Sequence, residues 1–211
     1  MDNKVLGAVS ALGVGVALAV AGMQPSSGMA GGAASSLADD AVHFTMKRSA
    51  GVESAGCLTD ASAKVTVKPG GIAETMTISA KRLPPNREFD VFVTQLPNAP
   101  FGVSWYQGDL ESDAYGNAHG RYVGRFNVET FAIAPGVGPA PVVFDGDGSQ
   151  NVASPPIHTY HVGIWFGSPE AAAAAGCPAT VTPFNGEHNA GIQALSTRNF
   201  GDLNGPLRAI D

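Results

Sequence analysis

Short runs of alternating apolar and polar residues, each closed by glycine, proline or asparagine, fill much of this 211-residue chain. Alternation with a period of two is typical of β-strands that bury one face, and the 27 glycines and 15 prolines supply the turns between them. The segments that we expect to form strands are 42–47, 63–68, 75–82, 88–96, 103–111, 119–126, 131–134, 157–166 and 187–195.

The regular spacing of these strands predicts an all-β fold of two antiparallel sheets packed face to face, as in an immunoglobulin-like sandwich. A closed β-barrel is the alternative. Strand 88–96 carries apolar residues on both faces, so we expect it to be central. One segment has helix signals: Ser168 as N-cap, Pro169 in the first turn, a run of alanines and the terminating Gly176. This short helix would end directly before Cys177.

Residues 5–23 form an uncharged apolar run directly behind Lys4, and a tract rich in Gly, Ala and Ser follows. This order is typical of an export signal. The run is also long enough for an uncleaved membrane anchor, which needs about 17 to 25 apolar residues. We therefore expect 1–38 to be a signal peptide or an N-terminal anchor with a small-residue linker, and 39–211 to be a single β-sandwich domain. The protein would be secreted or associated with the cell envelope, and only an uncleaved leader would attach it to a membrane.

The chain has two cysteines, Cys57 and Cys177. In an oxidising compartment two cysteines most simply form one disulfide. The bridge would close a loop of about 120 residues, which the chain-entropy model values at about 4 to 5 kcal/mol. A catalytic thiolate is not favoured, because no pattern of histidine or asparagine indicates one.

The net charge is −6, and Lys and Arg form no cluster longer than pairs such as Lys47-Arg48 and Lys81-Arg82. A protein that binds nucleic acid needs a basic surface that follows the phosphates. We therefore do not expect nucleic acid as a partner, and expect instead a protein or glycan at the cell envelope.

The best metal candidate is the loop 145–151, where oxygen-bearing side chains recur at alternate positions. A tight loop can turn such side chains toward one calcium ion. The loop departs from the EF-hand pattern, because Gln150 stands where glycine is required and Pro156 where a bidentate glutamate is required. A solvated polar loop is the favoured interpretation, and no other cofactor is expected. The candidate metal ligands are Asp145, Asp147, Ser149 and Asn151.

Asp109, Glu111 and Asp113 lie at alternate positions near the end of an expected strand, so their side chains would share one face. A charge ladder with the arginines of the returning strand is the simplest interpretation. A metal- or glycan-contacting acidic patch and a paired-carboxylate hydrolase are the alternatives. No serine-nucleophile elbow, zinc-protease helix or phosphate-binding glycine loop is present, and no catalytic residue is assigned. The histidines that a hydrolase would use are His119, His161 and His188.

Both tryptophans lie in expected strands, Trp105 in 103–111 and Trp165 in 157–166. Aromatic residues in strands usually belong to the core, but an exposed one forms a platform for a sugar ring or a hydrophobic partner. The polar, glycine-flanked segment 184–191 is expected to be a loop held by the disulfide, and such loops often carry binding groups. The candidate ligand-binding residues are Asp109, Glu111, Trp105 and His188.

Three segments, 83–93, 105–110 and 183–191, together resemble a set of exported proteins from high-GC Gram-positive bacteria that has no established activity. The run Leu-Pro-Pro-x-x-x-Phe-x-Val at 83–91 also resembles bacterial immunoglobulin-like extracellular domains, which implies only a fold. We therefore expect an exported, non-enzymatic binding or cell-envelope interaction module. The alternatives are an extracellular hydrolase with an acidic and histidine site, and a calcium-stabilised adhesive domain.

Overall fold

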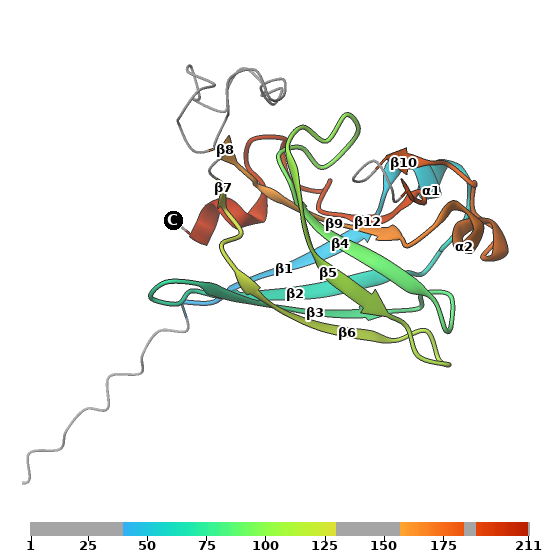
Figure 1. Cartoon of the computed structure of the whole chain (residues 1–211), viewed down its shortest axis with the longest axis horizontal. Helices are drawn as coiled ribbons and strands as arrows, with labels where there is room; N and C mark the ends of the chain where they lie inside the picture. Colours follow the sequence, from blue (N-terminus) through green and yellow to red (C-terminus); the bar gives the residue numbers. More distant parts are fainter. Residues whose placement is uncertain (1–39, 130–156, 184–188, 211) are drawn as a thin grey trace, which may run out of the picture. The chain divides into compact units, whose positions relative to one another are not determined.

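The computed structural model describes residues 40–129, 157–183 and 189–210 (Figure 1). Contacts between residues divide the chain into two units, Met1–Ala38 and Asp39–Asp211. The first unit, which contains the predicted leader, lies outside the described residues, so the choice between signal peptide and anchor stays a prediction. Within the described ranges, no helix combines the length and the apolar character that crossing a membrane requires.

Antiparallel strands dominate the second unit, which confirms the all-β prediction. One sheet has eight strands in the order β5-β4-β9-β12-β1-β2-β3-β6, and two short sheets pair β7 with β8 and β10 with β11. The strands are β1 (Val42–Arg48), β2 (Ser62–Lys68), β3 (Glu74–Lys81), β4 (Glu88–Thr94), β5 (Ser104–Glu111), β6 (Ala118–Gly124), β7 (Val128–Glu129), β8 (Ile157–His158), β9 (His161–Phe166), β10 (Thr182–Pro183), β11 (Asn189–Ala190) and β12 (Gln193–Ser196).

The large sheet consists of two halves with a narrow connection. We call β1, β2, β3 and β6 the first half-sheet, and β12, β9, β4 and β5 the second half-sheet. Two residue pairs join them, Lys47 with Ser196 and Arg48 with Leu195. At the opposite edges β5 and β6 are consecutive and meet at a bridge between Ser112 and Ala118. The sheet therefore nearly closes on itself, which matches the barrel alternative, whereas an immunoglobulin-like strand arrangement is not confirmed.

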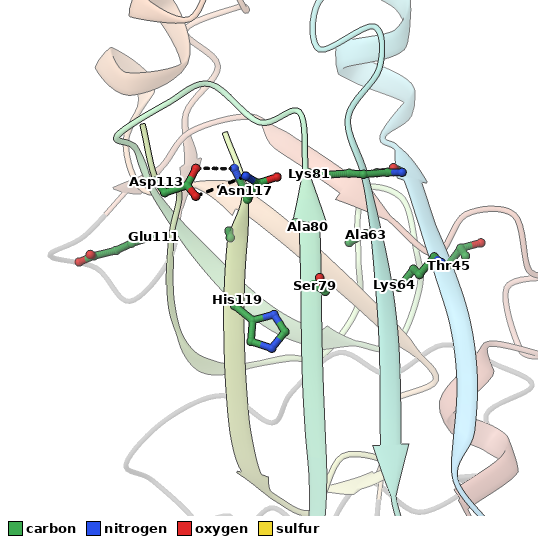
Figure 2. Close-up of a pocket in the computed structure, with 12 residues that line it drawn as sticks. Thr45, Ala63, Lys64, Ser79, Ala80, Lys81, Glu111, Asp113, Asn117 and His119 are labelled. Atoms are coloured by element: carbon green, nitrogen blue, oxygen red, sulfur yellow. Dashed lines mark hydrogen bonds between the residues drawn. The ribbon is translucent and has the colours of Figure 1, made fainter. Parts of the chain in front are cut away.

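The first half-sheet follows the alternation that the sequence predicts (Figure 2). In β2, Val65 and Val67 are buried, whereas Lys64 and Lys68 are exposed. β1 and β3 pair with β2 in register, and β6 pairs with β3, so each strand contributes apolar side chains to the inner face and mainly polar ones to the outer face. One face thus packs against the core, and the other is solvated.

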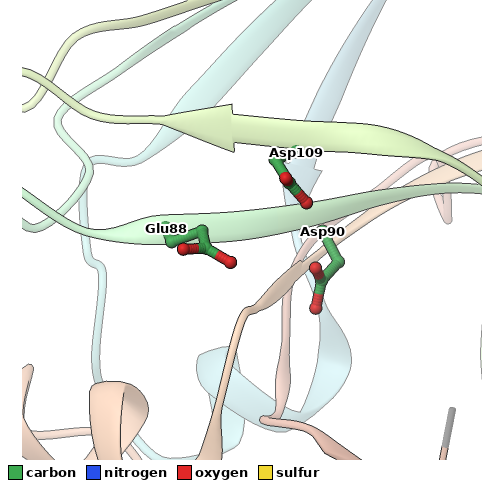
Figure 3. A group of neighbouring side chains, drawn as sticks. All are labelled: Glu88, Asp90 and Asp109. Carbon is green, nitrogen blue, oxygen red and sulfur yellow. The ribbon is translucent and has the colours of Figure 1, made fainter. Parts of the chain in front are cut away.

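Three strands of the second half-sheet, β4, β9 and β12, are buried on both faces almost throughout, whereas its edge strand β5 is largely exposed. β4 pairs with β5 on one side and with β9 on the other, so the prediction that it is central is confirmed. Asp90 and Phe92 on its outer face are buried, as Phe89 and Val91 are on its inner face. Three acidic side chains of this half-sheet are drawn in Figure 3. Every residue of β9 is buried as well.

The inner faces of both half-sheets meet in one hydrophobic core. The rings of Phe89 and Phe166 lie 5.0 Å apart, centroid to centroid. Truncating a side chain at such a position to alanine costs about 2 to 5 kcal/mol. Fully buried core side chains include Met46, Met76, Ile78, Phe89, Leu110, Phe126, Ile164 and Phe166.

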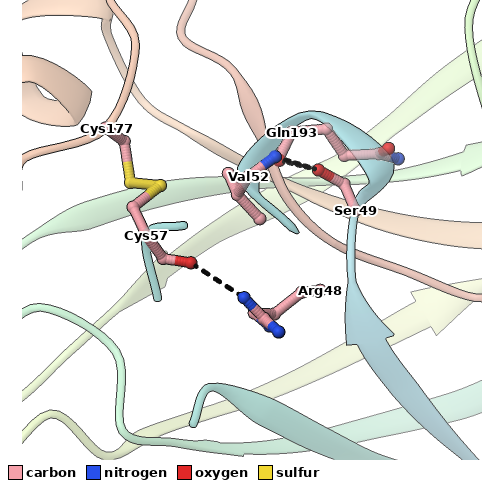
Figure 4. The surroundings of a disulfide bond; sticks show 6 residues. All are labelled: Arg48, Ser49, Val52, Cys57, Cys177 and Gln193. Atoms are coloured by element: carbon pink, nitrogen blue, oxygen red, sulfur yellow. Dashed lines mark hydrogen bonds between the residues drawn. A yellow bond between two sulfur atoms is a disulfide. The ribbon is translucent and has the colours of Figure 1, made fainter. Parts of the chain in front are cut away.

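The predicted disulfide between Cys57 and Cys177 is confirmed, with the two Cα atoms 5.5 Å apart (Figure 4). Each cysteine follows a short helix, α1 (Ala50–Ser54) or α2 (Pro169–Ala174). The predicted cap of α2 is present, because Ser168 Oγ accepts the N–H of Ala171 at 3.1 Å. The sequence did not predict α1 or the 3₁₀ helix η1 (Pro206–Ile210), since five residues are too few to reveal a helical period.

Two segments predicted as single strands are interrupted. The segment 157–166 divides into β8 and β9, because the chain leaves the ladder at Thr159, whose hydroxyl donates to the carbonyl of Phe126 at 2.7 Å. The segment 187–195 contains β11 and β12, separated by Gly191, where a Cβ atom would lie 2.5 Å from the carbonyl oxygen of Ser168. The predicted strand 131–134 lies outside the described residues.

Candidate ligand-binding face

The outer face of the second half-sheet gathers acidic and aromatic side chains. On β4, Asp90 lies opposite Asp109 of β5 and opposite Trp165 of β9. Phe92, two residues further along β4, lies opposite Tyr106 of β5. Side chains directly opposite each other in an antiparallel pair project on the same side and touch. We call this surface the acid–aromatic face; it consists of Glu88, Asp90, Phe92, Tyr106, Asp109 and Trp165.

An irregularity in β5 places Tyr106 and Asp109 on the same face. Residues three apart on a regular strand project to opposite faces. Here Val91 pairs with Gly108 while Phe92 pairs with Tyr106, so β5 contains one extra residue, Gln107. Such a bulge shifts the alternation by one position. Gly108 has φ of 145°, a conformation that favours glycine.

The bulge brings the Tyr106 hydroxyl to the Asp109 carboxylate, to which it donates a short hydrogen bond. Burial raises the pKa of Tyr106 far above its usual value, and the hydrogen bond to Asp109 and the charges of Asp109, Asp90 and Glu88 raise it further. The phenol therefore stays protonated at physiological pH and remains a donor. The negative potential of the carboxylates is the cause of part of this shift.

Glu88, Asp90 and Asp109 form a compact carboxylate cluster (Figure 3). Each offers an oxygen, and these oxygens all lie within 4.8 Å of one another. Asp90 is buried, whereas Glu88 and Asp109 are exposed. Within the described ranges, no other group of three His, Cys, Asp or Glu side chains comes close enough to hold a metal ion. Carboxylate oxygens of this kind can accept hydrogen bonds from hydroxyl groups or bind a hard cation.

Aromatic rings enclose a groove beside the carboxylates. Trp165 packs edge-on against Phe92 and Phe101, with ring centroids 5.2 Å and 5.0 Å away. Phe101 follows the cis peptide bond between Ala99 and Pro100 and has a positive φ of 57°. The groove has a volume of about 320 Å³, and its lining residues include Phe92, Pro100, Phe101, Trp165 and Pro183. A neighbouring hollow of about 810 Å³ shares Pro100, Phe101 and Pro183.

Two buried nitrogen donors border these hollows. The indole nitrogen of Trp165 and the amide nitrogen of Gln193 have no hydrogen-bond partner within the described part of the chain. Trp165 lines the aromatic groove, and Gln193 lines the neighbouring hollow. A buried donor without a partner costs about 1 to 3 kcal/mol.

Only part of the predicted ligand-binding set lies on this face. Asp109 belongs to it. Trp105 is 48% exposed, but it pairs with the inward-facing Val93, so its side chain projects to the other side of β5. Glu111 lies opposite Glu88 and so projects to the same side of the sheet, but it is not part of the carboxylate cluster and lines a different hollow next to the first half-sheet. His188 lies outside the described residues.

The predicted alignment of Asp113 with Asp109 and Glu111 is wrong, because β5 ends at Glu111. Asp113 instead forms the turn to β6: one of its carboxylate oxygens accepts the backbone N–H groups of Tyr115 and Asn117, each at 2.8 Å. These hydrogen bonds, that from Asn117 first, lower the pKa of Asp113.

The residues considered for a hydrolase are distributed over different parts of the structure. Asp109 lies in the carboxylate cluster, whereas Glu111 and His119 line the hollow beside the first half-sheet. His161 is fully buried, and its Nε2 lies 2.8 Å from the carbonyl oxygen of Asp202. Burial lowers its pKa. The predicted calcium ligands, Asp145, Asp147, Ser149 and Asn151, lie outside the described residues.

Most of the acid–aromatic face was missed at the level of sequence. Glu88, Asp90 and Phe92 alternate along one strand, a signal that could have grouped them with each other. Their grouping with Tyr106 and Asp109 depends on the register of two strands and on the bulge at Gln107, neither of which a single sequence specifies.

Comparison with known proteins adds no relative: no protein-family model matches the chain, and no curated protein matches it.

Proposed function

We propose that this chain is an exported, non-enzymatic binding module that recognises a hydroxyl-rich glycan of the cell envelope through its acid–aromatic face. The observation that carries the proposal is the bulge in β5, which sets Tyr106 and Asp109 on the same side as Asp90. Tyr106 lies opposite Phe92 and Asp90 opposite Trp165, and both of these aromatic residues line the groove. The resemblance to exported bacterial proteins is consistent with it and remains a prediction.

Export is supported by two features. The apolar run 5–23 has the composition of a leader. The buried Cys57–Cys177 disulfide is the type of crosslink that persists in oxidising compartments and is rare in the cytosol. A mass measurement on protein recovered from the culture medium tests this step, because export with cleavage removes the leader mass and the disulfide removes two hydrogens. Intact Met1 in a membrane fraction would instead favour the anchor.

A glycan suits the chemistry of the face. A sugar ring has an apolar side that packs against aromatic rings such as Phe101 and Tyr106, and hydroxyl groups that donate to carboxylates such as Asp109. Sites for small ligands typically combine an apolar concave surface with a few fixed polar groups.

Titration calorimetry with chitohexaose, cellohexaose and mannohexaose tests the proposal. Binding of at least one of these neutral oligosaccharides is expected, and Asp109→Asn should weaken it about tenfold, because a charged hydrogen-bond acceptor is lost. Tyr106→Phe should weaken it less, since the ring stays and only the link to Asp109 is lost.

Matched controls separate the face from general effects. Asp60→Asn and Tyr115→Phe make the same chemical changes at exposed positions outside the face and should leave the affinity unchanged. Equal affinity in Asp109→Asn and Asp60→Asn, or no binding of any of the oligosaccharides, would contradict the proposal.

The carboxylate cluster favours a second candidate function, calcium-stabilised adhesion. Three negative charges within 4.8 Å repel one another, and a bound calcium ion would offset this repulsion. A cation present at 100 times its dissociation constant stabilises the fold by about 2.7 kcal/mol. Calcium should then raise the melting temperature of the wild type and not that of Asp90→Asn. An unchanged melting temperature in the wild type would remove this candidate.

A further inference from the structure

The outer face of the first half-sheet has the opposite chemistry to the acid–aromatic face. We call it the basic face. Its cationic side chains come from all four strands and are exposed: Lys47, Lys64, Lys68, Lys81 and Arg121. Two imidazoles, His43 and His119, lie among them. The remaining positions are Val123 and a set of hydroxyl side chains: Thr45, Ser62, Thr66, Thr75, Thr77 and Ser79.

No outward position of these four strands is Asp or Glu. The chain as a whole has 18 acidic and 12 basic residues, so this face reverses the sign of the molecule. Within the described ranges the ion pairs are formed by Arg48, Arg125 and Arg198, none of which projects from the basic face. The cations of the face are therefore available to an external anion.

The register distributes these cations across the sheet. His119 lies opposite Ser79, which lies opposite Lys64, and Thr45 completes the row. In the next row Arg121 and His43 flank Thr77 and Thr66. Neighbouring strands are about 4.8 Å apart, and outward residues of one strand are about 6.7 Å apart. Cationic side chains therefore recur at intervals of about 8 to 13 Å with hydroxyl groups between them.

A hollow of about 650 Å³ lies at one end of this face (Figure 2). Lys64, Lys81, Ser79 and His119 line it, and Glu111 and Asp113 also border it. The carboxylate of Asp113 is engaged by Tyr115 and Asn117 of the turn. Figure 2 shows the side chain of Glu111 directed away from Lys81 and His119.

We propose that the basic face binds an acidic polysaccharide, a polymer of sugars that carries negative charge at regular intervals. Charge complementarity supports the choice of a polyanion. The hydroxyl groups between the cations can exchange hydrogen bonds with sugar hydroxyls as well as with acidic groups. Single-stranded nucleic acid is disfavoured, because no outward position of the four strands is Phe, Tyr or Trp, the large rings on which bases stack best.

This binding site is independent of the acid–aromatic face. Affinity for oligogalacturonate and for heparin fragments, measured by titration at low ionic strength, should be present and should be lost near 1 M salt, where the screening length falls to about 3 Å. Lys64→Gln combined with Arg121→Gln should weaken binding about tenfold, and each single substitution about threefold. Arg208→Gln removes one exposed positive charge from η1 and should change nothing.

A failure here can be told apart from a failure of the proposed glycan site. Asp109→Asn should retain the acidic polysaccharide, and the Lys64→Gln, Arg121→Gln variant should retain the neutral oligosaccharide. No affinity for either acidic polysaccharide, equal affinity in the double variant, or tighter binding of oligothymidylate than of both polysaccharides would overturn the proposal.

Discussion

The two half-sheets share one core but differ in what their outer faces do. The first half-sheet exposes a face of lysine, histidine, serine and threonine that carries no carboxylate. On the outer face of the second half-sheet, Phe92 and Trp165 are buried and pack with Phe101, and a cluster of three carboxylates lies beside them, two of which are exposed. A chain with a modest net charge can thus present two surfaces of opposite sign, because the outward residues of the two half-sheets come from different strands.

The largest expected difference between the two outer faces is in the stability lost when one outward side chain of each half-sheet is truncated to alanine. Trp165→Ala should destabilise the fold by about 3 to 5 kcal/mol, because it leaves a cavity among Phe92, Phe101 and Ala190. Thr77→Ala in β3 should cost less than about 1 kcal/mol, since its side chain is partly solvated. Urea unfolding of both variants measures the difference. Similar losses would show that the two outer faces are equally packed.

Removing the disulfide tests how firmly the two halves are tied together. Cys57 follows β1 and α1 of the first half, and Cys177 follows β9 and α2 of the second. Cys57→Ser combined with Cys177→Ser should lower the free energy of unfolding by about 2 to 5 kcal/mol. Reduced wild-type protein should match the double variant. If both unfold at the same urea concentration as oxidised wild type, the bridge does not hold the halves.

A smaller effect is expected at the edge where β5 approaches β6. The hydroxyl of Tyr122 donates to the carbonyl of Asp109 at 2.9 Å and so links these strands from the inside. A Cβ atom at Gly120 would lie 2.4 Å from that hydroxyl, so Gly120→Ala should displace Tyr122 and cost about 1 to 3 kcal/mol. At Gly124 the nearest atom is 3.4 Å away, and Gly124→Ala is the matched control. Equal losses would contradict the role of Tyr122.

The smallest effect concerns His161, which lies opposite Thr94 in the second half-sheet and is fully buried. Burial lowers the pKa of His161, so the folded protein binds fewer protons there than the unfolded chain does. The free energy of unfolding should therefore fall as the pH decreases through about 6.5, the usual histidine value, and this contribution is fully retained above that pH.

His161→Gln should reduce this pH dependence by at most about 1.4 kcal/mol per pH unit. Thermal unfolding of the wild type and of His161→Gln between pH 5 and 8, centred on about pH 6.5 where histidine titrates, measures the difference. An unchanged slope in His161→Gln would assign the dependence to other groups.

The fold was predictable from sequence wherever one face of a strand is buried. Val65, Val67, Lys64 and Lys68 alternate as the pleat requires, and their environments agree with that pattern. The α2 helix was predictable because its cap, Ser168, is adjacent to it in the sequence. The disulfide was predictable because the chain has two cysteines and a predicted export signal. The division of 157–166 was not, because Thr159 leaves the ladder for a hydrogen bond to distant Phe126.

The two proposed binding surfaces were harder to predict from the sequence than the fold was. No run of basic residues in the sequence indicates the basic face. Lys64, Lys81 and Arg121 are far apart in the sequence and come together only because their strands are neighbours in the sheet. The acidic cluster was assigned to Asp109, Glu111 and Asp113, whereas the partners of Asp109 are Glu88 and Asp90 on the preceding strand. Which residues meet on the basic face and in the carboxylate cluster depends on the register between paired strands. The alternation within one strand gives no information about that register.

The extra residue in β5 makes the acid–aromatic face depend on chain length as well as on residue type. Deletion of Gln107 would keep Gly108 opposite Val91 and Tyr106 opposite Phe92 and would only remove the bulge. If β5 instead paired regularly at its present length, Trp105 would face outward and Tyr106 inward. Which of the two rings lies on the acid–aromatic face is therefore decided by how the strand accommodates one additional residue.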